Sequence, residues 1–152
     1  YEDFKAPKQD WKQLVSSVLS NCSALTDLNM SRTDLQVDIR EIIEEVGGPL
    51  KILKISETGC SGDLKVLAKA PNLEVFDASK TRIAGNISVF KSGIPNIQHL
   101  NLSFSATRGY FDELCDCKKL KYINLKESRC MGDKRVLARS LPDCKEIIVT
   151  EH

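Results

Sequence analysis

Histidine is scarce in this sequence, with only two among 152 residues, so little material exists for histidine-based catalysis or metal binding. Charge of one sign is also lacking, because 22 Lys and Arg nearly balance 21 Asp and Glu for a net charge of +1. A balance of this kind gives no general attraction to nucleic acid or to an anionic membrane. No apolar run approaches the roughly 20 residues that a membrane-spanning helix needs. We therefore expect no nucleic acid partner and no membrane span.

Catalytic motifs are missing as well. The sequence contains no nucleophile elbow, no Gly-rich phosphate loop and no zinc-binding His-Glu helix. Cys115 and Cys117 could be combined with His99 into a metal site, but two ligands two residues apart with no second pair are a weak signal. We predict that the protein is not an enzyme, with no catalytic residues, no metal and no cofactor.

The beginning of the sequence is polar. Residues 1–10 carry no apolar stretch, so they do not form a secretory signal peptide. The sequence also starts without Met, which fits either the removal of a presequence or a fragment of a longer chain. We expect a soluble protein. The sequence does not fix its compartment, and the candidates are an organelle lumen or the extracellular space after loss of a presequence.

A repeated phrase is the main positive signal. A Leu-like residue is followed by two variable residues, an apolar residue, one variable residue and another apolar residue. The phrase begins at Leu25, Leu50, Leu73, Ile97, Leu120 and Cys144, at steps of 25, 23, 24, 23 and 24 residues. Alternation of this kind predicts a short strand with one face in the core, and no single copy can bury that face alone. Stacked copies are therefore expected.

Further columns continue the repeat after each strand. A hydroxyl column comprises Thr33, Thr58, Thr81, Ser105 and Ser128, and a glycine column comprises Gly62, Gly85, Gly109 and Gly132, with Val37 in the first copy. Hydroxyl side chains at the strand exit can bond turn backbone groups that would otherwise be buried without a partner. The glycines indicate a turn with positive φ or a close approach of two backbones.

These columns resemble the leucine-rich-repeat superfamily, and within it the plant-type pattern LxxLxLxxNxLxGxIP. The third copy, LEVFDASKTRIAGNISVFKSGIPN, agrees in spacing through the Gly and the following Ile. It departs by Thr or Ser in place of the ladder Asn, and by Ser88 in place of the Pro. The resemblance covers about residues 25–152 and implies an α/β solenoid. The expected fold is an arc of about five to six repeats of 23–25 residues with parallel strands on one face.

The two ends of the chain differ. Trp11, Leu14, Val15, Val18 and Leu19 follow the spacing of one helical face, and Asp10 is a candidate N-cap with Gln13 at the capping-box position. We predict a helix over residues 10–20 that caps the first repeat, so that residues 1–24 form an N-terminal extension and capping helix and residues 25–152 form the repeat domain. The last copy supplies only a strand, and we expect its edge to be covered by another chain or by further repeats.

The six cysteines fall largely in core columns. Cys60 and Cys130 align with Leu35 and Ile83, and Cys144 takes the first Leu position. Free cysteine behaves as a small buried apolar residue, so we expect mostly buried, reduced thiols. A disulfide between neighbouring coils stays open as an alternative.

The exposed side of the predicted strands is the candidate binding surface. One column reads Asp27, Ile52, Val75, His99, Tyr122 and Glu146, the next reads Asn29, Lys54, Asp77, Asn101, Asn124 and Ile148, and a third reads Arg32, Glu57, Lys80, Phe104 and Glu127. Strands favour β-branched and aromatic residues in any case, but this row is more apolar than solvation requires. The predicted partner-binding residues are Ile52, Val75, His99, Phe104, Tyr122 and Asn124.

Charge is uneven along the repeats. Residues 25–49 hold six acidic and two basic side chains, for a net charge of −4. Residues 118–145 hold nine basic and three acidic side chains, for a net charge of +6. An acidic partner is favoured at the C-terminal end. Two functions stay open: a non-catalytic protein–protein interaction module that serves as a scaffold or accessory subunit of a larger assembly, and a fragment of a recognition ectodomain that binds a peptide or small ligand.

Overall fold

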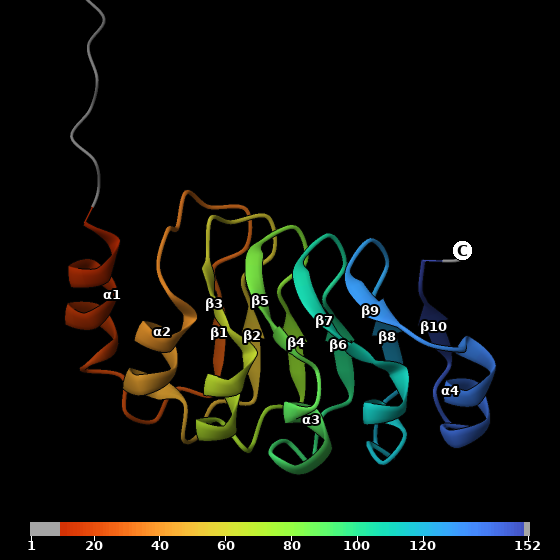
Figure 1. The fold of residues 1–152 in the computed structure, drawn as a ribbon. Coiled ribbons are helices and arrows are strands. Elements are labelled where there is room, and N and C mark those ends of the chain that lie inside the picture. Colours follow the sequence, from red (N-terminus) through yellow and green to blue (C-terminus); the bar gives the residue numbers. More distant parts are fainter. Residues whose placement is uncertain (1–9, 151–152) are drawn as a thin grey trace, which may run out of the picture.

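The computed structural model describes residues 10–150, and these residues form a single stack of coils (Figure 1). Each coil runs through a strand, a turn, in most coils a second strand, and a helix. The elements are α1 (Trp11–Leu19), β1 (Asp27–Asn29), α2 (Ile39–Val46), β2 (Ile52–Lys54), β3 (Ser61–Asp63), η1 (Leu64–Lys69), β4 (Val75–Asp77), β5 (Arg82–Asn86), α3 (Val89–Ser92), β6 (His99–Asn101), β7 (Ala106–Tyr110), η2 (Phe111–Leu114), β8 (Tyr122–Asn124), β9 (Arg129–Met131), α4 (Lys134–Ser140) and β10 (Glu146–Ile148). The α/β solenoid predicted from the repeats is confirmed.

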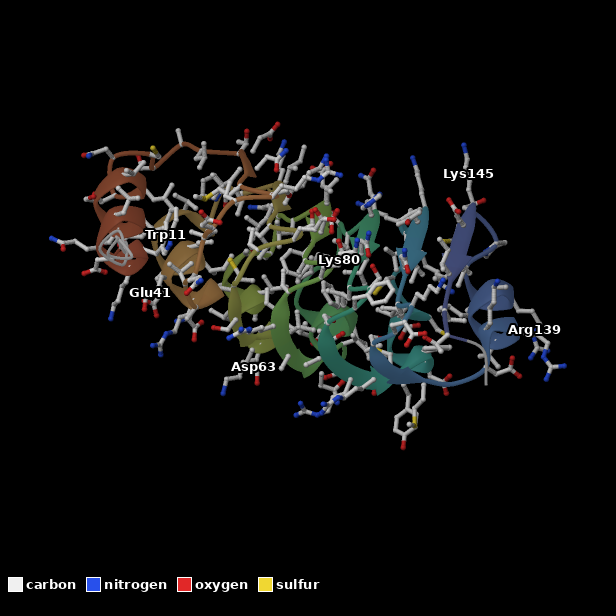
Figure 2. All side chains as sticks on the ribbon, turned by 90° about the horizontal axis from the view of Figure 1, so that it is seen from above. Trp11, Glu41, Asp63, Lys80, Arg139 and Lys145 are labelled. Atoms are coloured by element: carbon white, nitrogen blue, oxygen red, sulfur yellow. The ribbon has the colours of Figure 1, made fainter. Side chains whose placement is uncertain are left out.

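Two parallel sheets run along the stack. Sheet A has six strands in the order β1-β2-β4-β6-β8-β10, and sheet B has four in the order β3-β5-β7-β9. Sheet A contains the strand of every repeated phrase, centred on Leu28, Leu53, Phe76, Leu100, Ile123 and Ile147. Lys145 next to β10 and Asp63 at the end of β3 lie on opposite sides of the stack, so the two sheets face in different directions (Figure 2).

The core lies between the sheets and the row of helices. Its side chains come from the same position in successive repeats, as with Leu53, Phe76, Leu100 and Ile123, which are all 0% exposed. The rings of Phe76 and Phe90 pack with their centroids 6.5 Å apart, which joins sheet A to the helical side. Because each layer is covered by the next, the chain buries its apolar edges by stacking.

The hydroxyl column closes the turn after each strand of sheet A. In the third repeat Thr81 donates to the carbonyl of Ala78 at 2.6 Å and accepts from the backbone N–H of Ile83 at 3.4 Å. Thr33, Thr58, Ser105 and Ser128 make the same two bonds in their own repeats. The hydroxyls thus satisfy backbone groups within each turn, as the sequence indicates.

The glycine column combines positive φ with close packing. Gly62, Gly85, Gly109 and Gly132 have φ between 111° and 143°. A Cβ on Gly109 would lie 2.6 Å from the Oδ1 atom of Asn86 in the preceding coil. Both requirements that the sequence indicated are therefore present at the same position.

The N-terminal helix is confirmed, but fewer side chains of its apolar face are buried than predicted. Asp10 caps α1 by accepting from the backbone N–H of Gln13, and Val15 and Leu19 are buried. Leu14 and Val18 of the predicted apolar face are nevertheless 38% and 54% exposed. Together with Leu28 and Met30 they line an open apolar groove of about 200 Å³. The reason is that α1 packs against α2 and leaves the outer edge of β1 open; residues 1–9 of the predicted extension lie outside the described part.

At the opposite end, β10 pairs with β8 alone among residues 10–150. Ile147 and Val149 are packed against the core but only partly buried. The expected covering of this edge by another chain or by further repeats stays a prediction.

All six cysteines lie within the described part, and all are free thiols. Only Cys60, Cys117 and Cys130 are buried, whereas Cys22, Cys115 and Cys144 are half-buried, so the expectation that most are buried is only half met. Cys22 and Cys144 lie near the two ends of the described stack, and Cys115 directly follows η2 on the helical side. The structure contains no disulfide between neighbouring coils.

The buried cysteines are expected to resist labelling by a thiol reagent in the native protein. Burial raises the pKa of Cys60 and Cys130, and burial together with the charge of Asp116 raises the pKa of Cys117 to about 11. Because the thiolate is the reactive form, these three should react slowly at pH 8 and quickly after unfolding in urea. Mass spectrometry of labelled peptides checks the assignment, and rapid native labelling of four or more cysteines would contradict it.

Candidate functional site

The register of sheet A brings the predicted surface residues into one row. Asp27, Ile52, Val75, His99, Tyr122 and Glu146 are successive neighbours across the six strands. Ile52, Val75, His99 and Tyr122 are half-buried on the outer face of the sheet. With Phe104 and Asn124 they make up the sheet A patch, the set that the sequence predicts as partner-binding.

A stacked pair of rings lies within this patch. His99 on β6 and Tyr122 on β8 face each other with centroids 4.3 Å apart and planes 9° from parallel. Their backbones are direct neighbours in the sheet, so each ring holds the other in position. The result is a flat, rigid platform, which a partner can contact at little cost in side-chain entropy.

Electrostatics favour a neutral imidazole in this pair. Burial lowers the pKa of His99 below its ordinary value, and the charge of Asp77 opposes that effect. The lowered pKa favours the neutral form of the histidine, and the stack presents an apolar surface with polar edges.

Asn124 has a supporting role that the sequence did not indicate. Its Nδ2 donates to the Tyr122 hydroxyl at 3.3 Å, while its Oδ1 accepts from the backbone N–H of Lys126 at 3.1 Å. The side chain thereby ties the tyrosine to the turn that follows β8. Equivalent turn bonds are made by Asn29, Asp77 and Asn101. These side chains fix the turn backbone and are only partly available to a partner.

The third predicted column occupies an unusual backbone conformation. Arg32, Glu57, Lys80, Phe104 and Glu127 all have φ between 54° and 60°, which non-glycine residues rarely adopt. Nothing in these residue types indicates a left-handed conformation, and only their repeated position could have suggested it. The turn directs Phe104 outward, where its side chain is 49% exposed.

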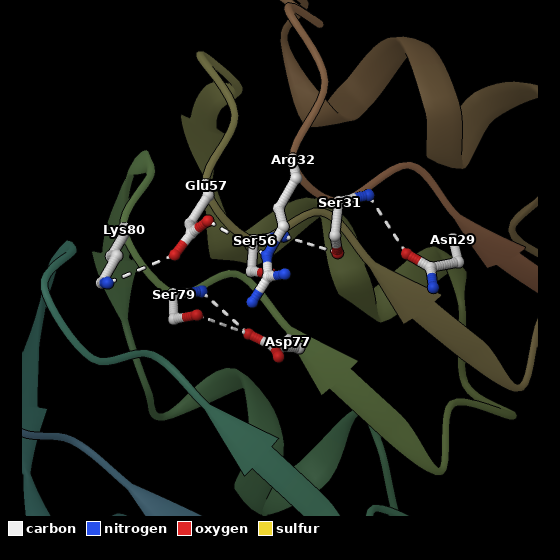
Figure 3. A network of polar contacts seen from close by, with 8 residues as sticks. All are labelled: Asn29, Ser31, Arg32, Ser56, Glu57, Asp77, Ser79 and Lys80. Atoms are coloured by element: carbon white, nitrogen blue, oxygen red, sulfur yellow. Dashed lines mark hydrogen bonds and ion pairs between the residues drawn. The ribbon is translucent and has the colours of Figure 1, made fainter.

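In the first three repeats, ion pairs join the residues of this column (Figure 3). Glu57 lies between Arg32 and Lys80, with nitrogen–oxygen distances of 3.2 Å to each. These pairs are exposed, and each is worth little on its own. They pair the charges of Arg32, Glu57 and Lys80, and Phe104 is the one apolar residue of the column.

The described residues hold no group of three or more His, Cys, Asp or Glu side chains placed to bind a metal ion. No helix within residues 10–150 is long and apolar enough to cross a bilayer. Every buried side-chain nitrogen or oxygen of this part has a hydrogen-bond partner.

Solved structures of similar fold exist, although no family model and no curated protein sequence matches the chain. The receptor kinase HAESA of Arabidopsis, in complex with the peptide hormone IDA and the co-receptor SERK1, has a TM-score of 0.72 and 22% identity over 89% of this chain and 23% of that one. An internalin from Listeria monocytogenes has a TM-score of 0.71 and 18% identity over 90% of this chain and 38% of that one.

The ectodomain of the Arabidopsis receptor kinase SOBIR1 has a TM-score of 0.64 and 19% identity, and the match covers 83% of this chain and 74% of that one. Like the 23% of the HAESA chain, the match covers only 14% and 22% of two other plant receptor chains. At these identities the likeness concerns the fold. The protein has the leucine-rich-repeat fold, an α/β solenoid of parallel strands.

Proposed function

We propose that the protein is a non-catalytic protein–protein interaction module whose sheet A patch contacts a protein partner. The observation that carries the proposal is the in-register row on sheet A, with the stacked His99 and Tyr122 at its centre. Aromatic side chains are enriched in interface cores, whereas a purely solvated sheet face needs none. The titratable groups nearby serve structure, since Asp77 accepts turn hydrogen bonds and His99 is stacked, which supports a non-enzymatic role.

A scaffold or accessory subunit of a larger assembly is the form of this function that we favour. Among residues 10–150 the outer edges of β1 and β10 pair with no further strand, and such edges are suited to further association. The C-terminal end carries Lys134, Arg139 and Lys145 among its exposed residues, and Figure 2 shows Arg139 and Lys145 at the end opposite Glu41. We propose an acidic partner for this end.

The alternative is a fragment of a recognition ectodomain that binds a peptide or small ligand. It is supported by the HAESA structure, which holds a peptide hormone. The Gly column and its spacing support a plant-type subclass with Thr and Ser replacing the ladder Asn, and such a fragment would belong outside the cell or in an organelle lumen. Co-purification from native material with mass spectrometry distinguishes a protein assembly from a bound peptide.

Replacing Tyr122 and Phe104 together with alanine is expected to weaken binding of the co-purified partner by about 2 kcal/mol or more, because buried aromatic anchors dominate interface energetics. Isothermal titration calorimetry measures the change. Val18→Ala is the control, since Val18 lies on α1, outside the sheet A patch, and is 54% exposed. An unchanged affinity in a folded double variant would exclude the sheet A patch as the binding surface.

A further inference from the structure

Sheet B presents a second exposed array. On β7 the side chains of Arg108 and Tyr110 are exposed, and on β9 those of Arg129 and Met131 are exposed. The register pairs Arg108 with Arg129 and Tyr110 with Met131. Tyr110 and Met131, at 62% and 55%, are the most exposed large apolar side chains among residues 10–150, and they are direct neighbours. We call these four residues the sheet B array.

The scaffold beneath the array is rigid. Cys130, between Arg129 and Met131, is buried, and so is Thr107, which directly precedes Arg108 on β7 and is hydrogen-bonded to Ser105 at 2.9 Å. Gly109, between Arg108 and Tyr110 on β7, belongs to the glycine column and has a φ of 126°. The four outward side chains are therefore spaced by the strand geometry, about 4.8 Å between strands and about 7 Å along each strand.

Two arginines placed directly opposite each other on neighbouring strands repel, which costs the fold some stability. Within residues 10–150 neither Arg108 nor Arg129 takes part in an ion pair. The acidic residue that follows β9, Asp133, is already engaged by Arg135 at 3.0 Å. The guanidinium groups thus form a charged pair that is free to bind carboxylates from outside, each in a bidentate geometry.

We propose that the sheet B array binds an acidic segment of another protein. Carboxylates of that segment pair with Arg108 and Arg129, and an apolar side chain packs on Tyr110 and Met131. Arginine, tyrosine and methionine are the residue types enriched in interface cores, and all three meet here. An extended segment fits the spacing, because its alternate side chains are also about 7 Å apart.

The array is separate from the sheet A patch and does not depend on it. Sheets A and B face different directions, so both surfaces can be occupied at the same time. The two surfaces share the repeats that contain β6 to β9. A module with two such surfaces joins two proteins, which is the property a scaffold needs.

The experiment uses an array of 12-residue synthetic peptides. One set carries Glu or Asp at alternate positions with one Leu or Phe, and matched sets replace the acidic residues by Gln or Lys. The native protein is expected to retain acidic peptides that contain an apolar residue. Fluorescence anisotropy on the strongest peptide should show at least tenfold weaker binding for Arg108→Ala with Arg129→Ala, and likewise for Tyr110→Ser with Met131→Ser.

Matched controls separate this surface from the other. Arg82 on β5 is also an exposed arginine of sheet B without an ion pair among residues 10–150, and Arg82→Ala should leave the affinity unchanged. The Tyr122 and Phe104 double variant should also bind normally, so a failure of the sheet A proposal leaves this result intact. All variants change exposed or half-buried side chains, and their thermal midpoints confirm folding.

Two results would overturn the proposal. The first is equal retention of acidic and Gln-substituted peptides by the native protein. The second is binding that requires the arginines but not Tyr110 or Met131 and that a single-stranded RNA oligonucleotide of the same charge reproduces. The latter would show a general anion surface in place of a protein-binding one.

Discussion

Replacing Phe76 with alanine is expected to lower the free energy of unfolding by about 3–5 kcal/mol. Phe76 is 0% exposed in the middle repeat and packs against Phe90. Removing the ring takes away its apolar burial and leaves a cavity between the sheet and the helical side. The coils on either side pack against that layer, so the substitution should lower the stability of the whole stack. Urea unfolding followed by circular dichroism measures the change.

Phe76→Leu is the matched control for this prediction. Leucine keeps much of the apolar volume, and Phe76 lies between two leucines, Leu53 and Leu100, in the same core row. We expect the leucine variant to lose clearly less stability than the alanine variant. Equal losses would mean that the position is sensitive to any change, and a loss below about 1 kcal/mol for alanine would contradict the packing described here.

The second large effect is expected from Thr81→Val, which removes a hydroxyl while keeping the shape of the side chain. Thr81 is buried and bonds both the Ala78 carbonyl and the Ile83 N–H. A buried backbone group left without its partner costs about 1–3 kcal/mol, and here two are affected. The same unfolding experiment should therefore show a clear loss of stability.

Thr33→Val tests the same bonds in an exposed setting. Thr33 bonds the carbonyl of Met30 and the N–H of Leu35, but the side chain is exposed, so water can replace the hydroxyl. The expected loss is smaller than for Thr81→Val. If both substitutions cost the same, burial of the turn is not what makes the hydroxyl column important.

Several features were predictable from the sequence because they depend on local periodicity. The strand of each repeated phrase is centred on the expected residue, as with Phe76 and Leu100, since alternation along a strand decides which face is buried. Helix α1 begins after Asp10 because an N-cap followed by apolar residues at helical spacing is a local signal. The hydroxyl column was predictable for the same reason, since each hydroxyl bonds within its own turn. The glycine column was predictable from its regular spacing, although Gly109 also needs its small size against Asn86 of the preceding coil.

Sequence by itself thus determined the period, the strands of sheet A, the capped helix and the row of side chains on the outer face. Tertiary structure alone decided sheet B, the left-handed turn at Phe104, the stacking of His99 on Tyr122 and the pairing of Tyr110 with Met131. It also decided that, within residues 10–150, α1 leaves the outer edge of β1 without a neighbouring strand. The physical reason is distance along the chain. Contacts between residues about 23 apart depend on how one coil is placed on the next, and that placement follows from the packing of the whole stack.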